Sequence, residues 1–203
     1  HIDIAQWALG KQDTSPVKVK GTGKFTPAVP EKFDWAAYFD GRATLPSSYN
    51  TATEFSIDLE FADGGVINVR DIHRSGEGDA KIEFYNGILF EGDAGRLTGK
   101  PVEQLTQADK EKLDRAVAKL YKGKTPGDHM KNFFDCLEDR SQPVSDVGTH
   151  HRTMTSCHLC NIALMLGREL HWDPAAETFV ADKEATALMS RKRRTGFELS
   201  EKS

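Results

Sequence analysis

The sequence is poor in cysteine and has no long apolar run. Its three cysteines, Cys136, Cys157 and Cys160, are too few and too clustered for a disulfide framework, so we expect reduced thiols. No apolar stretch approaches the roughly 18 residues that a membrane-spanning helix needs. We therefore expect no membrane partner.

Common nucleotide-binding and catalytic motifs are also missing. The chain contains no G-x-G-x-x-G, no G-x-x-x-x-G-K-[ST], no H-E-x-x-H and no G-x-S-x-G. Gly21-Thr-Gly23 precedes no predicted helix and is not a dinucleotide loop. The residues present therefore do not make a complete enzyme, and we expect no cofactor-binding residue and no metal ligand among them.

A concentrated basic surface is lacking as well. The formal net charge is −4, and Lys and Arg are intermixed with Asp and Glu. The densest basic run, Arg191-Lys-Arg-Arg194, is interpreted as a solvated helix end. Because phosphate binding needs a basic face, nucleic acid is not expected as a partner. The 203 residues, 38% apolar, are enough for one domain with a hydrophobic core.

What the sequence does contain is strand patterning in its first half. In residues 53–61, Phe55, Ile57, Leu59 and Phe61 fall on one face and polar residues on the other. Asn86-Gly87 predicts a tight hairpin between strands at 81–85 and 88–90. Residues 21–52 are predicted to be a long connection with one helical turn near Trp35. Further strands are predicted at 17–20, 66–72 and 96–98.

Helical patterning takes over after residue 101. Thr106 and Asp109 resemble a capping box for a helix that stops at Gly123, and Thr125-Pro126 is expected to open a second helix. Two more helices are predicted at about 149–166 and 182–193. Strands followed by helices predict an α+β fold. We expect an open, mainly antiparallel sheet, with helices packed on one face and concentrated in the C-terminal half.

The third predicted helix carries a cluster of histidines and cysteines. His150, Cys157 and Cys160 fall near one another on a helix, and zinc accepts such ligands. No second cysteine pair exists, and a thioredoxin-like context is missing. We favour a packed helix with core thiols and keep a small Cys/His metal-binding domain as an alternative.

Two groups of polar residues are candidates for binding a ligand. Arg70, His73 and Arg74 stand where a strand breaks into a glycine loop, and they suit a hydroxylated or acidic substrate. The second group, His150, His151 and Arg152, stands at the start of the third predicted helix. A solvated hairpin tip and surface histidines without a role are the alternatives.

The first ten residues predict a helix without a beginning. Ile4, Trp7 and Ala8 share a face, and Gly10 stands where a C-cap glycine belongs. A helix that starts at residue 1 lacks the preceding turn that would cap it. We expect that the chain is part of a longer protein.

Several stretches resemble one family. Asp3, Trp7 and Gly10 are similar to the helix H-x-x-D-x-x-x-W-x-x-G of the Gfo/Idh/MocA (glucose–fructose oxidoreductase/inositol dehydrogenase) family, and Phe90-Glu-Gly-Asp-Ala-Gly-Arg-Leu97 is similar to its hairpin. The tail resembles the planctomycete-type bacterial branch. It does so through His129-Met-Lys-Asn-Phe-Phe-Asp-Cys-Leu137, Pro143-Val-Ser-Asp146, His150-His-Arg152, Cys157-His-Leu-Cys-Asn-Ile-Ala163, Leu166-Gly-Arg168, Trp172-Asp-Pro174 and Ser190-Arg191.

The resemblance implies that residues 1–203 are the C-terminal substrate-binding and oligomerisation domain of an NAD(P)-dependent oxidoreductase. An N-terminal Rossmann domain of the same polypeptide would bind NAD or NADP. The substrate would be sugar-like or a polyol, and the protein would be a homo-oligomer through its sheet. A variant that uses the nicotinamide to cleave a glycoside stays open, as does a location in the cytoplasm or the periplasm. The fragment alone is expected to be inactive.

The family's catalytic histidine is assigned through the same helix. Alignment on Asp3, Trp7 and Gly10 places that histidine one position before His1, and we favour this register. If the register is shifted by one, His1 is the catalytic residue. Asp3 on the same helix is a further candidate for binding the substrate. The remaining alternative to the whole assignment is a non-catalytic sheet module that binds a protein or a carbohydrate.

Overall fold

The computed structural model describes residues 1–203 except 76–80, 85–86, 94, 99–105, 121–127 and 198–203. The chain divides into two compact units. Unit 1 comprises His1 and residues 86–151, and unit 2 comprises residues 2–85 and 152–203. Unit 2 is therefore formed from two separate stretches of the sequence.

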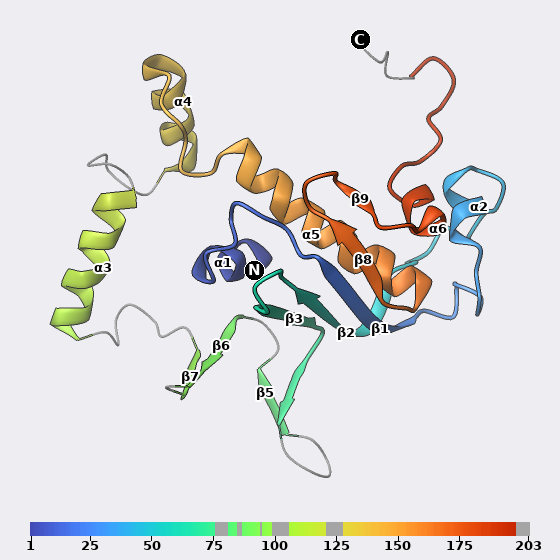
Figure 1. The fold of residues 1–203 in the computed structure, drawn as a ribbon, viewed down its shortest axis with the longest axis horizontal. Helices are drawn as coiled ribbons and strands as arrows, with labels where there is room; N and C mark the ends of the chain where they lie inside the picture. Colours follow the sequence, from blue (N-terminus) through green and yellow to red (C-terminus); the bar gives the residue numbers. More distant parts are fainter. Residues whose placement is uncertain (76–80, 85–86, 94, 99–105, 121–127, 198–203) are drawn as a thin grey trace. The chain divides into compact units, whose positions relative to one another are not determined.

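Unit 2 is built on a five-stranded antiparallel sheet (Figure 1). Its strand order is β3-β2-β1-β8-β9. The strands are β1 (Lys18–Phe25), β2 (Ala52–Glu60), β3 (Val66–Arg70), β8 (Leu170–Asp173) and β9 (Thr178–Phe179). The α+β fold with a mainly antiparallel sheet is confirmed. Two details of the prediction are wrong. Residues 21–25 were predicted to belong to a connection but continue β1. Two strands that were not predicted, β8 and β9, follow the helices in the sequence.

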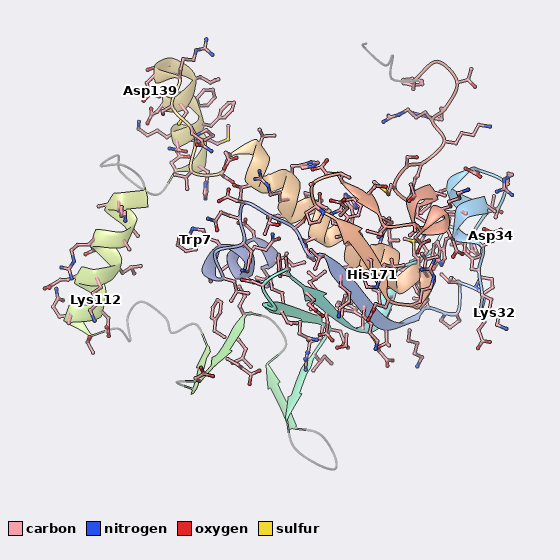
Figure 2. The ribbon with its side chains drawn as sticks, viewed as in Figure 1. Trp7, Lys32, Asp34, Lys112, Asp139 and His171 are labelled. Atoms are coloured by element: carbon pink, nitrogen blue, oxygen red, sulfur yellow. The ribbon has the colours of Figure 1, made fainter. Side chains whose placement is uncertain are left out.

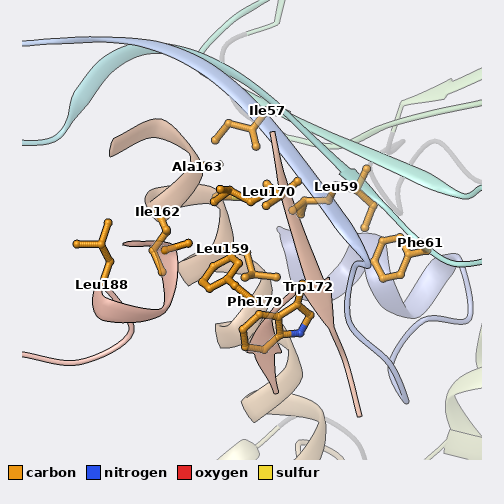
Figure 3. Close-up of a cluster of buried hydrophobic side chains, with 14 of the residues drawn as sticks. Ile57, Leu59, Phe61, Leu159, Ile162, Ala163, Leu170, Trp172, Phe179 and Leu188 are labelled. Carbon is orange, nitrogen blue, oxygen red and sulfur yellow. The ribbon is translucent and has the colours of Figure 1, made fainter. Parts of the chain in front are cut away.

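The helix α5 (Val147–Leu166) covers one face of this sheet with its C-terminal part. Leu159, Ile162 and Ala163 of α5 pack in one hydrophobic core with apolar residues of the strands (Figure 3). The period-two pattern of β2 supplies Ile57 and Leu59, which are 2% and 0% exposed. Burial of such side chains is the main stabilising term, at about 1.5–3 kcal/mol each. The helix ends at Gly167, whose φ of 61° suits a C-cap glycine.

Three short helices and a hairpin complete the description of unit 2. The helix α1 (Ile2–Ala8) ends before Gly10, which has a φ of 66°. The predicted helical turn near Trp35 is α2 (Trp35–Phe39), and its aromatic residues join the core. The helix α6 (Lys183–Ala187) is shorter than the predicted 182–193, and Asp182 caps its first turn. The strand β4 (His73–Ser75) pairs with β5 (Lys81–Phe84).

Unit 1 contains one hairpin and two further helices. The strands β6 (Leu89–Gly92) and β7 (Gly95–Thr98) pair with each other, in the segment that resembles the family's hairpin. The expected turn at Asn86-Gly87 lies partly outside the described residues. The described strands before and after it pair with other strands, β5 with β4 and β6 with β7.

The helices of unit 1 begin where side chains can cap them. α3 (Gln107–Leu120) starts after Thr106, whose Oγ1 accepts a hydrogen bond from the Asp109 N–H at 3.2 Å, as predicted. α4 (His129–Asp139) begins after Asp128, which accepts hydrogen bonds from two N–H groups of the first turn, at 2.9 and 3.2 Å. The expected start at Thr125-Pro126 and the expected stop at Gly123 lie outside the described residues.

Candidate functional site

The face of the unit 2 sheet that α5 does not cover is polar. We call it the polar face, and it presents the alternate residues of four strands. Its side chains are exposed or half-buried. They are Lys18, Lys20, Thr22 and Lys24 of β1, Glu54, Ser56, Asp58 and Glu60 of β2, Asn68 and Arg70 of β3, and His171 of β8, which is labelled in Figure 2. Val66 at the start of β3 is an apolar residue on the same face.

Charge on the polar face is sorted by strand. The sheet register places the three lysines of β1 opposite three carboxylates of β2 in the pairs Lys18–Glu60, Lys20–Asp58 and Lys24–Glu54. Lys18 forms an ion pair with Glu60, and the Lys24 Nζ lies 3.3 Å from Glu54 Oε1. The hydrogen bond with Glu60 raises the pKa of Lys18. Exposed pairs of this kind contribute little to the stability of a fold.

Arg70 stands at the end of a hydrogen-bonded chain across the polar face. Its Nε donates to Asn68 Oδ1, and Asn68 Nδ2 donates to Asp58 Oδ1 at 2.5 Å. Asn68 Nδ2 also lies 3.4 Å from Ser56 Oγ. Of the three ligand candidates Arg70, His73 and Arg74, Arg70 therefore has a defined position on the polar face. His73 and Arg74 belong to β4, and their side chains lie outside the described part of the chain.

Asp3 and Arg152 connect α1 to α5 within unit 2. Asp3 Oδ1 accepts a hydrogen bond from Thr153 Oγ1 at 3.3 Å. A second bond, also 3.3 Å long, runs from Arg152 to the carbonyl oxygen of Gln12 in the loop after α1. Both candidate residues therefore hold α1 and its following loop on α5. Ile4 and Trp7 of α1 are 48% and 59% exposed, whereas Gln6 is buried.

The remaining candidates belong to unit 1. His150 and His151 are exposed in the first turns of α5, and His1 is exposed just before α1. His150 Nε2 lies within hydrogen-bond distance of Ser145 Oγ. Asp146 caps the helix through the Thr149 N–H at 3.0 Å and the Thr149 hydroxyl at 2.7 Å. The hydroxyl bond from Thr149 is the main cause that lowers the pKa of Asp146.

Of the two cysteines of α5, Cys160 is buried and Cys157 is half-buried, and both are free thiols. Burial raises the pKa of Cys160 to about 12 and also raises that of Cys157. Zinc binds the thiolate form, which these surroundings disfavour. No group of three or more His, Cys, Asp or Glu side chains in the described ranges is arranged to hold a metal ion. The geometry is that of the packed helix with core thiols.

Sequence reasoning missed most of the polar face. Lys18, Lys20 and Asn68 were not singled out because each is an ordinary surface residue when taken alone. The alternation in β2 did predict that Glu54, Ser56, Asp58 and Glu60 share a face. Only the register with β1 shows that a basic stripe lies beside an acidic one.

Among the described helices, none combines the length and apolarity needed to cross a bilayer.

A half-covered antiparallel sheet with one long helix is an α+β fold. The model of one protein family, described as "Oxidoreductase family, C-terminal alpha/beta domain", matches residues 1–199. The chain therefore belongs to the Gfo/Idh/MocA oxidoreductase family and corresponds to its C-terminal domain. No curated protein and no solved structure matches the chain.

Proposed function

We propose that the chain is the substrate-binding and assembly domain of an NAD(P)-dependent oxidoreductase that acts on a sugar or polyol. An N-terminal Rossmann domain of the same polypeptide would bind the dinucleotide. The observation that carries the proposal is the polar face, an exposed and ordered surface in a chain of an oxidoreductase family. The tail motifs further favour the planctomycete-type bacterial branch.

The residues present fit a division of labour between two domains. The sequence has no glycine-rich phosphate loop, so the cofactor would be held outside these residues. Guanidinium and imidazole groups suit the hydroxyls of a sugar, and for that role we propose Arg70, His73, Arg74, His150 and His151. Asp3 and Arg152 would position α1, which carries His1 at its start. Bound NAD(P) would supply hydride transfer.

Calorimetric titration with NAD(H) tests the proposal. The isolated chain should show no heat of tight binding, and the full-length parent protein should bind the dinucleotide. Tight binding by the isolated chain would refute the two-domain assignment. As a matched pair in the parent, R70A should raise the KM for the substrate, whereas R42A, which removes an exposed arginine paired with Asp40 at 2.9 Å, should not.

We further propose that the polar face joins two copies of the chain. A two-fold axis parallel to the strands, between β1 and β2, would stack the basic stripe of each copy on the acidic stripe of the other. Such an association should weaken with salt, because the screening length for charge interactions, about 10 Å at 0.1 M, becomes shorter as the salt concentration rises. The variant K20E should weaken it, and the double variant K20E/D58K should restore it. Equal masses for the wild-type chain, K20E and K20E/D58K in sedimentation experiments would argue against this interface.

A further inference from the structure

The helix α4 of unit 1 carries an exposed apolar stripe. Met130, Phe133, Phe134 and Leu137 are 60%, 48%, 55% and 47% exposed. Their spacing of i, i+3, i+4 and i+7 places all four on one side of the helix. Stripes with this spacing are the anchors by which amphipathic helices bind apolar partners. Isolated exposed apolar residues are common, but four on one helical face need an explanation.

The opposite side of α4 is held by the segment that follows it. Asn132 Oδ1 accepts a hydrogen bond from the Val144 N–H at 3.0 Å, and the Ser141 hydroxyl lies 3.3 Å from Cys136 Sγ. Cys136 is 7% exposed. Asp128 caps the first turn of the helix. The helix is thus fixed on its polar side while its apolar stripe faces outward, with the Phe133 and Phe134 rings 5.5 Å apart.

We propose that this stripe binds the same stripe of a second copy of the chain, with the two α4 helices antiparallel. Centred between Phe133 and Phe134, an antiparallel pair places Met130 opposite the partner's Leu137 and Phe133 opposite the partner's Phe134. The contact is isologous, because one patch meets itself about a two-fold axis. Bulky side chains then meet bulky side chains along the whole stripe.

The charges beside the stripe select this orientation. Lys131, Asp135 and Glu138 lie along one edge of it, and Lys131 Nζ is 2.8 Å from Asp135 Oδ2 within the same helix. In an antiparallel pair this edge meets its own copy in reverse, so Lys131 approaches the acidic end of the partner's edge. In a parallel two-fold pair, this edge would instead lie opposite the other edge of the partner's stripe, which carries His129 and Cys136 and no carboxylate of α4. Only the antiparallel arrangement brings Lys131 to the partner's carboxylates.

The area of the stripe sets the strength of the association. Large apolar side chains bury about 150–250 Å² each. At about half exposure, four of them offer roughly 400 Å² per copy, or about 800 Å² for the pair. Stable interfaces bury about 1,200–2,000 Å². We therefore expect a weak dimer that forms and dissociates with concentration. The polar face is a separate surface, so the two associations are independent.

Analytical ultracentrifugation between about 5 and 500 µM tests the proposal, since a weak interface changes state in this range. The wild-type chain should reach twice the limiting mass of the variant F134D. The matched control is L113D, which places the same charge at a 41% exposed leucine of α3 and should behave as wild type. Far-UV circular dichroism should show equal helix content in all three. A wild-type mass that does not change with concentration, or equal effects of F134D and L113D, would overturn the proposal.

Charge reversal tests the orientation. K131E and D135K should each self-associate at least several-fold more weakly than wild type, because each makes the edge more uniform in charge. An equimolar mixture of K131E and D135K should recover association, and so should the double variant K131E/D135K. Single variants that associate as wild type, or a mixture no stronger than its components, would rule out the antiparallel pair. Neither result depends on whether the parent protein binds NAD(P).

Discussion

Replacing Gly23 with alanine should destabilise unit 2, because α5 approaches β1 too closely for a side chain there. A Cβ at residue 23 would lie 2.8 Å from Leu164 Cδ2 and 3.1 Å from the carbonyl oxygen of Glu54. The leucine methyl can rotate away, but the backbone oxygen cannot. Crowding of this kind costs about 1–3 kcal/mol. The lower entropy of the unfolded alanine chain returns about 0.4–1 kcal/mol. The net loss in the free energy of unfolding should be about 1–2 kcal/mol.

Urea unfolding followed by tryptophan fluorescence measures this loss, since Trp35 and Trp172 are buried in unit 2. Gly21 is a graded comparison, because its added Cβ would meet only side-chain atoms, at 3.2 Å or more, and G21A should cost less. The control G92A has open space on β6 and should be neutral or slightly stabilising. In a double-mutant cycle, L164A should cost less in the G23A background, with a coupling of about 0.5 kcal/mol or more. A neutral G23A or an additive cycle would refute the reasoning.

Three further changes probe other contacts. D182A removes the cap of α6 and the partner of Arg168 and should cost about 0.5–2 kcal/mol. The hydrogen bond from Arg168 lowers the pKa of Asp182. The stabilisation that ionised Asp182 gives the fold is therefore complete above about pH 4 and is lost as the pH falls through the lowered pKa. Urea unfolding at pH 3 and pH 6 should show that D182A costs less at pH 3. S15A leaves the indole N–H of Trp172, now 3.3 Å from Ser15 Oγ, without its buried partner and should cost about 1–3 kcal/mol in thermal unfolding. Burial holds the pKa of Cys160 at about 12, so iodoacetamide at pH 8 should alkylate it roughly 1,000-fold more slowly in the native chain than in urea, as peptide mass mapping would show; similar rates would contradict its burial.

Particular residues decide what the sequence can predict. The alternation of apolar residues in β2 predicted both its extent and its buried face. The continuation of β1 was missed because its two positions on the α5 side, Gly21 and Gly23, are glycines. The same glycines that let Leu164 approach remove the apolar signal by which a strand is recognised. Close packing and a readable pattern are in conflict at this point of the chain.

The polar face and the helix boundaries show a different limit. A capping side chain acts locally, but several residue types can cap a helix, and the observed cap of α4 is Asp128. Pairing between strands is not local. The basic stripe of β1 acquires meaning only from its register with β2, which lies about 30 residues further along. The family motifs were enough to indicate which domain this is. Predicting the surface that the domain presents required knowledge of the fold.

The order of the sheet has a consequence for how the chain is made. One side of β1 pairs with β2, but its other side pairs at Lys18 and Val19 with β8, which lies near residue 170. A ribosome adds about 5–20 residues per second, so roughly ten seconds or more separate the appearance of these two strands. During that time one edge of β1 has no strand beside it, and unpaired edges invite aggregation. Newly made chains should therefore be most dependent on chaperones just before β8, at residues 170–173, emerges.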